Sequence, residues 1–116
     1  MSNIIENQPI DYEFLKKIIG DDKEFEKELF NIFIDSSKYN ISKLEKAILS
    51  EDNNSWYMAS HAMKGSSASI GAFSLSKALE VAQKISDDKL DKKIEILDNI
   101  KLEFEIVHEF IKKKLG

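Results

Sequence analysis

The chain contains no cysteine and no arginine, and each absence excludes a class of site. Without cysteine, the fold holds neither a disulfide nor a metal ion bound through thiolates. All 17 basic residues are lysines, so the planar guanidinium that grips phosphate or guanine through paired hydrogen bonds is missing. Together with a net charge of −4, this makes nucleic acid a poor candidate partner.

Long apolar runs are also missing. No run approaches the roughly 18 residues that a membrane span requires, and residues 1–8 lack the basic and apolar regions of a secretion signal. We therefore expect a cytoplasmic location and no membrane contact by this domain. With 42% hydrophobic residues among 116, the chain can build one core. We expect a loose lead-in over residues 1–8 and a single domain over residues 9–116.

Proline and glycine are scarce, with one and four residues, which suits long helices joined by short connections. Apolar residues recur three and four positions apart, and no alternation typical of strands occurs. The spacing predicts a short helix from Pro9 to Gly20 and longer helices over about 22–50, 53–70, 72–86 and 90–114. This pattern implies an all-α fold, an antiparallel four-helix bundle with a short additional N-terminal helix.

Each predicted helix has an apolar stripe that we expect to face the core. The second stripe is interrupted by Ser36, Ser37 and Asn40, where we expect a bend or a polar contact without a break in the helix. The inward residues are, in chain order, Ile10, Phe14 and Ile18; Phe25, Leu29, Phe33, Ile41, Leu44 and Ile48; Trp56, Ala59, Met63, Ser67 and Ile70; Leu75, Ala78, Leu79, Ala82 and Ile85; and Leu90, Ile94, Leu97, Ile100, Phe104, Val107 and Ile111.

The third of these five helices carries the chemistry. At about 100° per residue, His61 lies about 140° from Trp56, away from the buried stripe. Lys64, Gly65 and Ala68 share its side because they follow it at spacings of three, four and seven residues. A glycine inside a helix costs about 1 kcal/mol relative to alanine. The pattern therefore indicates an exposed, nucleophilic imidazole among small side chains that admit a bulky partner, with one ammonium group in reach.

The string from His61 to Ala72, HAMKGSSASIGA, resembles the signature of histidine-containing phosphotransfer (HPt) domains. The resemblance extends over nearly the whole chain, from Ile10 and Asp11 to the last helix. It implies the same helical bundle and a phosphoryl group carried on the imidazole. The positions that match the signature are His61, Lys64, Gly65, Ser66, Ser67, Ala68, Gly71 and Ala72.

The resemblance also implies roles for individual residues. His61 would accept the phosphoryl group, and Lys64 would support it electrostatically. Gln83, on the facing helix, would orient the imidazole through a hydrogen bond. Gly65 and Ala68 would keep the gap above the helix low.

Two further residues lie beside this gap on the helical wheel. Tyr57 is about 40° from His61, and Ala62 directly follows it in the sequence. Both are candidates for contact with a docking partner. For Tyr57, a half-buried packing role is an equally good interpretation.

The function implied by the resemblance is that of a phosphorelay intermediate. It would take a phosphoryl group from a receiver-domain aspartate and pass it to the aspartate of another receiver. The expected partners are response-regulator receiver domains and a hybrid sensor kinase. We expect no cofactor of its own, Mg²⁺ on the receiver, and no autonomous kinase activity.

Three other interpretations compete with the relay. The first is a non-catalytic helical adaptor that binds a receiver or another signalling partner without phosphotransfer. The second is the helical hairpin of a sensor kinase, which ranks lower because Ala62 stands where such hairpins usually carry an acidic residue. The third is a di-iron site on Glu105 and His108, which is rejected because a second Glu-x-x-His pair is missing.

Overall fold

The structure is a computed structural model that describes residues 8–116, and its regular elements in that range are all helical. The expected lead-in therefore falls outside the described residues except for Gln8. The predicted all-α architecture is confirmed. The helices, in chain order, are α2 (Tyr12–Ile19), α3 (Lys23–Ser50), α4 (Asn53–Ser69), α5 (Phe73–Lys84) and α6 (Leu90–Leu115).

Aspartate side chains fix where three of these helices begin. Asp11, Asp22 and Asp52 each stand just before a helix and accept a hydrogen bond from a backbone amide of its first turn, at 3.1, 3.0 and 3.0 Å. A capping carboxylate satisfies an amide that has no partner within the helix. The cap at Asp11 places the start of α2 at Tyr12, so the prediction of a helix from Pro9 is wrong by one turn.

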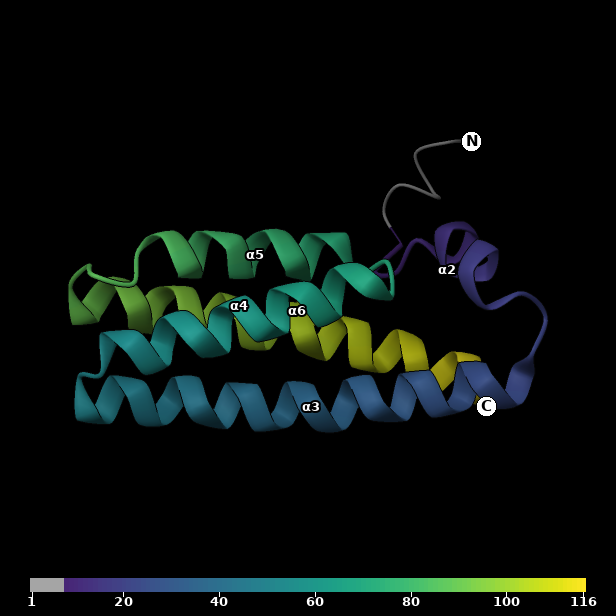
Figure 1. The fold of residues 1–116 in the computed structure, drawn as a ribbon, viewed down its shortest axis with the longest axis horizontal. Helices are drawn as coiled ribbons and strands as arrows, with labels where there is room; N and C mark the ends of the chain where they lie inside the picture. Colours follow the sequence, from purple (N-terminus) through teal and green to yellow (C-terminus); the bar gives the residue numbers. More distant parts are fainter. Residues whose placement is uncertain (1–7) are drawn as a thin grey trace.

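The four long helices form an up-down-up-down bundle, with α2 across one end (Figure 1). Helix α4 packs between α3 and α5, and α6 completes the ring against α5 and α3. Helices α4 and α6 thus lie diagonally opposite each other. Helix α3 runs without a break through its polar residues, where the Asn40 amide donates to the carbonyl of Ser36 at 3.0 Å.

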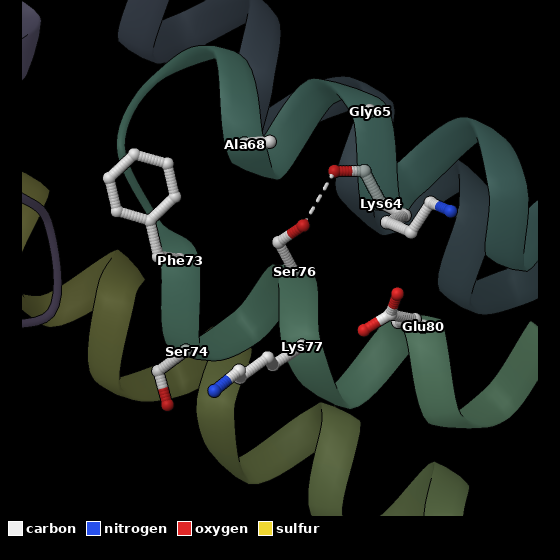
Figure 2. Close-up of a pocket in the computed structure, with 8 residues that line it drawn as sticks. All are labelled: Lys64, Gly65, Ala68, Phe73, Ser74, Ser76, Lys77 and Glu80. Carbon is white, nitrogen blue, oxygen red and sulfur yellow. Dashed lines mark hydrogen bonds between the residues drawn. The ribbon is translucent and has the colours of Figure 1, made fainter.

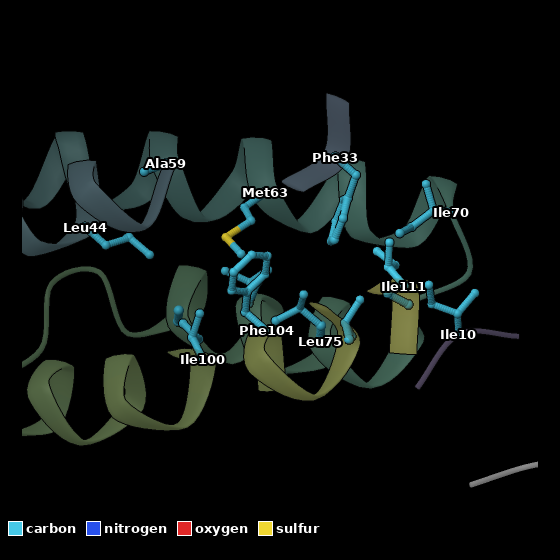
Figure 3. Packing of buried hydrophobic residues seen from close by; sticks show 14 of the residues in the cluster. Ile10, Phe33, Leu44, Ala59, Met63, Ile70, Leu75, Ile100, Phe104 and Ile111 are labelled. Atoms are coloured by element: carbon cyan, nitrogen blue, oxygen red, sulfur yellow. The ribbon is translucent and has the colours of Figure 1, made fainter. Parts of the chain in front are cut away.

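The core lies between the four long helices, and Figure 3 shows part of it. The predicted stripes of α4 and α5 are confirmed, with Trp56, Met63, Leu75 and Leu79 fully buried. The Trp56 indole donates its N–H to the carbonyl of Ala82 at 2.8 Å, which ties α4 to α5 inside the core. The second half of the predicted α6 stripe is also confirmed by the buried residues Leu97, Ile100, Phe104, Val107 and Ile111.

The predicted stripes are wrong near the N-terminal end of the fold. In α2, Leu15 and Ile19 are buried, whereas Ile18 is 58% exposed and Phe14 only half-buried. In α3, Phe25 is exposed and the neighbouring Glu26 is buried. The reason is the crossing of α2, whose Tyr12 hydroxyl donates to Glu26 Oε1 at 2.6 Å and covers that carboxylate.

A second error concerns the start of α6. Leu90 and Ile94 were expected inside but are 44% and 46% exposed, and Lys93 is buried in their place. The Lys93 ammonium reaches Asn53 Oδ1 at 2.5 Å and lies 5.5 Å from the Trp56 ring centroid. A lysine stem covers apolar surface while its charge finds a polar partner. Because Lys93 contacts Asn53 of α4, Lys93 faces the core at the start of α6, and Leu90 and Ile94 face solvent.

The connection between α4 and α5 depends on Gly71. Its φ is +82°, and its carbonyl accepts a hydrogen bond from the Asp11 amide at 2.9 Å. A Cβ at this position would lie 2.9 Å from the Asp11 carbonyl oxygen. Only glycine fits both the left-handed backbone and this close approach. The turn thereby anchors the segment before α2 to the end of the bundle.

Helices of the described range all fall short of the length and apolar character needed to cross a membrane.

Candidate functional site

The site residues come from the middle of α4 and the facing side of α5. Helix α4 buries Trp56, Ala59, Met63 and Ser67 against the core, and its opposite side faces solvent. The side chain of His61 lies on this solvent side and is exposed. Because α4 is held by α3 and α5 along its length, the imidazole stands on a supported helix rather than on a loop.

Tyr57 lies one turn before His61, and its ring is parallel to the imidazole. The two ring centroids are 6.1 Å apart and the planes differ by 2°. Tyr57 is exposed, at 43%. The phenol ring is therefore a direct neighbour of the ring expected to carry the phosphoryl group.

Lys64, Gly65 and Ala68 border a shallow groove of about 550 Å³ between α4 and α5. Figure 2 shows these residues on one wall and residues of α5, including Ser76 and Glu80, on the other. The Ser76 hydroxyl donates to the carbonyl of Lys64 at 3.1 Å and joins the two walls. The groove thus begins one turn beyond His61 and is fixed by a contact between the helices.

Gly65 is exposed, and a Cβ built on it would meet nothing within 4 Å. The fold therefore has no need for a glycine at this position. This contrasts with Gly71, where the backbone of the chain itself excludes a side chain. The space above Gly65 is open as far as the structure describes the chain, so we look for the reason for a glycine in what approaches this position.

Gln83 lies on the α4-facing side of α5. It lines a second hollow, of about 180 Å³, together with Tyr57, Lys64, Glu80 and Lys84. Its Oε1 is buried and accepts no hydrogen bond from any residue of the range 8–116. The structure thus brings Gln83 to the same small hollow as Lys64, without a hydrogen bond from the imidazole to its carbonyl oxygen. The orienting role implied by the resemblance stays a prediction.

Ala62 is exposed and lies outside both hollows, on the other side of His61. Its neighbour Met58 is 61% exposed and lines a separate hollow between α3 and α4. A partner that approaches His61 would therefore meet small or flexible side chains on one side and the α4–α5 groove on the other. The docking roles of Ala62 and Tyr57 remain predictions.

Sequence reasoning left the α5 wall of the groove unassigned except for Gln83. Its members recur at helical spacing, which is the signal that could have found them. Three of the charged groups in the two hollows are lysines, Lys64, Lys77 and Lys84, and one is a glutamate, Glu80. The two hollows between α4 and α5 are therefore locally basic although the whole chain carries −4, which favours an anionic group there.

Comparison with known proteins adds the family. The Hpt domain family matches residues 28–110, more than two thirds of the chain. No curated protein matches the chain. Among solved structures, the crystal structure of histidine-containing phosphotransfer protein B (HptB) from Pseudomonas aeruginosa PAO1 is similar, with a TM-score of 0.86 at 19% identity, over 93% of this chain and 95% of that chain. That likeness shows the fold, and the family match confirms the resemblance seen in the sequence. The chain belongs to the Hpt domain family, the histidine-containing phosphotransfer domains of phosphorelays.

Proposed function

We propose that His61 accepts a phosphoryl group from the aspartate of one receiver domain and donates it to the aspartate of another. The observation that supports this most directly is the exposed imidazole in the middle of α4, beside a glycine that the fold does not require. Near pH 7 much of an imidazole is neutral and nucleophilic. It can therefore attack phosphorus without a separate base.

In the accepting step, the unprotonated ring nitrogen attacks the phosphorus of the receiver's acyl phosphate. A nitrogen–phosphorus bond forms, the phosphorus–oxygen bond to aspartate breaks, and the carboxylate leaves with its electron pair. The other ring nitrogen still carries its proton, so the newly phosphorylated ring is at first a cation. This proton then passes to water and leaves the ring neutral. The donating step reverses these changes on a second receiver. Such transfer depends on in-line positioning and on charge neutralisation.

The electrostatic part of the work is divided between the two proteins. Lys64 stands one turn after His61 and supplies a cation beside the phosphoryl group, with Lys77 in the groove and Lys84 in the second hollow. We place the Mg²⁺ on the receiver, because the groove on this chain offers ammonium groups and one carboxylate, and a bound Mg²⁺ prefers several oxygen ligands. The partners in this proposal are the receiver domains of response regulators and a hybrid sensor kinase.

The chain offers a matched control for the test, because it contains two histidines. His108 is half-buried on α6, with its ring 5.4 Å from that of Phe104. Incubation with a receiver carrying labelled phosphate should give an acid-labile, alkali-stable label on the wild type and on His108→Gln. His61→Gln should carry none. Label on His61→Gln would refute the assignment.

Lys64→Ala gives the second arm of this experiment. We expect slower transfer with an unchanged circular dichroism spectrum, and no change for Lys27→Ala, an exposed lysine on α3. An unchanged rate in Lys64→Ala would remove its electrostatic role. Binding of receivers without any label on the wild type would favour the adaptor over the relay.

A further inference from the structure

We propose that Tyr57 is a positioning residue for His61, and that its ring holds the plane of the imidazole in the orientation used for attack. The inference rests on the proposed function of His61. Its basis is the parallel arrangement of the two rings, 2° between planes and 6.1 Å between centroids. Aromatic pairs favour offset parallel geometry at centroid separations of about 4.5 to 7 Å.

The position of Tyr57 in α4 places it beside His61. Side chains four residues apart lie on the same face of a helix, and the rotamers of the two residues then set the parallel arrangement of their rings. Within the described part of the chain, no group donates a hydrogen bond to the carbonyl oxygen of Gln83. In this proposal, the Tyr57 ring orients the imidazole of His61, a role that the resemblance implies for the side-chain amide of Gln83.

Tyr57 also reaches the facing helix. Its ring lines the 180 Å³ hollow together with Lys64 of α4 and Gln83 of α5, and 43% of its surface stays exposed. A ring with few alternative rotamers can restrict its neighbour at little further entropic cost.

Positioning and docking predict different kinetic effects. If Tyr57 orients the imidazole, its loss lowers the rate constant of the phosphoryl step and leaves the affinity for the receiver unchanged. If Tyr57 only contacts the partner, its loss raises KM for the receiver and leaves transfer from a small donor unchanged. The two roles can therefore be separated by comparing a small phosphoryl donor with a receiver.

Phosphoramidate is a suitable small donor. Its phosphorus–nitrogen bond breaks, ammonia leaves and takes a proton to become ammonium, and the new bond forms to the ring nitrogen. All variants carry His108→Gln, so that label reports on His61 alone. We expect Tyr57→Leu to lower the phosphorylation rate about three- to tenfold, the range that corresponds to a ring-pair interaction. Tyr57→Phe should keep nearly the wild-type rate, since the ring remains.

The matched control is Tyr39→Leu. Tyr39 is an exposed tyrosine on α3 whose ring lies beside the Lys43 ammonium, at 5.3 Å, rather than beside a histidine. We expect no change in the phosphoramidate rate. An equal loss in Tyr39→Leu and Tyr57→Leu would overturn the proposal, because the effect would then belong to loss of a tyrosine and not to its place.

Further outcomes keep the two proposals apart. A wild type that phosphoramidate phosphorylates on His61 but no receiver does would refute the relay and leave the effect of Tyr57 measurable. An unchanged phosphoramidate rate in Tyr57→Leu, with a raised KM for the receiver, would refute positioning. Should Tyr57→Leu fail to fold, nuclear Overhauser contacts between the two rings in the wild type decide the question, and their absence would overturn it.

Discussion

At Gly65, the fold would accept a side chain, whereas the proposed docking of a receiver would not. The helix would accept a side chain there, because a Cβ would meet nothing within 4 Å. We expect Gly65→Ala to stabilise the protein by up to about 1 kcal/mol, the difference in helix propensity. We expect the same variant to transfer phosphate from a receiver about tenfold more slowly or worse, because a misplacement of about 1 Å costs this much or more.

The test is whether Gly65→Ala raises the stability of the protein and at the same time lowers the rate of phosphoryl transfer. Thermal unfolding gives the stability, and single-turnover transfer from a labelled receiver gives the rate. Phosphoramidate serves as the control donor, because it is small enough to reach His61 past a methyl group. A Gly65→Ala protein that transfers as fast as the wild type would show that the gap has no role in docking.

At the site, the sequence predicted what one helix determines by itself. His61 lies on the solvent side of α4, and Lys64, Gly65 and Ala68 follow it along one groove, because the 3.6-residue period alone fixes these relations. The α5 wall and the parallel Tyr57 ring could not be predicted in this way. They depend on the rotation of α5 against α4 and on side-chain rotamers, which no spacing in the sequence encodes.

At the scale of the elements, Gly71 controls how the chain leaves α4. Gly71→Ala should lower the free energy of unfolding by about 2 kcal/mol or more, because the left-handed backbone and a contact with the Asp11 carbonyl both oppose a Cβ. Gly20→Ala is the matched control. Gly20 also has a positive φ, of +68°, but open space around it.

Urea unfolding followed by circular dichroism measures both variants. The Gly20 variant should lose less than the Gly71 variant, because backbone conformation alone, with φ of +68° and ψ of −142°, opposes a Cβ there. Equal losses in the two variants would show that the approach of Asp11 to Gly71 contributes nothing. The packing of Phe14 against Phe73, with ring centroids 5.1 Å apart, would then carry the attachment of α2.

The errors in helix phase are also explained at this scale. Where a helix packs between two neighbours along its length, as α4 does, its apolar stripe predicts the buried face correctly. At the ends of the bundle the neighbour changes, and polar contacts take over. Glu26 is buried by the Tyr12 hydroxyl and Lys93 by Trp56 and Asn53, so both stand where an apolar period predicts solvent.

At the scale of the whole molecule, α2 links the start of α3 to the end of α6. The hydrogen bond from the Tyr12 hydroxyl to Glu26, with smaller contributions from burial and from the negative charge of Glu26, raises the pKa of Tyr12 to about 12. The Lys114 ammonium lies 4.2 Å from the centre of the same ring. One tyrosine therefore contacts both long helices at this end of the bundle.

This shift sets the direction of a pH effect. Because the folded-state pKa is raised above the ordinary value of 10.0, the stabilising contribution of Tyr12 is fully present below about pH 10 and is lost as the pH rises toward about 12. Tyr12→Phe removes the contribution at every pH. We expect wild type and variant to differ most in urea midpoint at pH 9 and to converge by pH 12. A difference that stays constant from pH 9 to pH 12 would contradict the assignment.

The architecture itself could be predicted, since four long amphipathic stretches with short connections permit few arrangements other than a bundle. The position of α2 on the bundle could not be predicted, because it depends on contacts between residues far apart in the sequence, such as Tyr12 and Glu26, which are 14 positions apart.

The single tryptophan gives the molecule an optical reporter of its own. Its indole is fully enclosed, and its N–H bridges the two helices that form the groove beside His61. Any event that parts these helices would hydrate the ring and shift its fluorescence to longer wavelength. An event that only adds charge at the surface would leave the colour of the emission as it was.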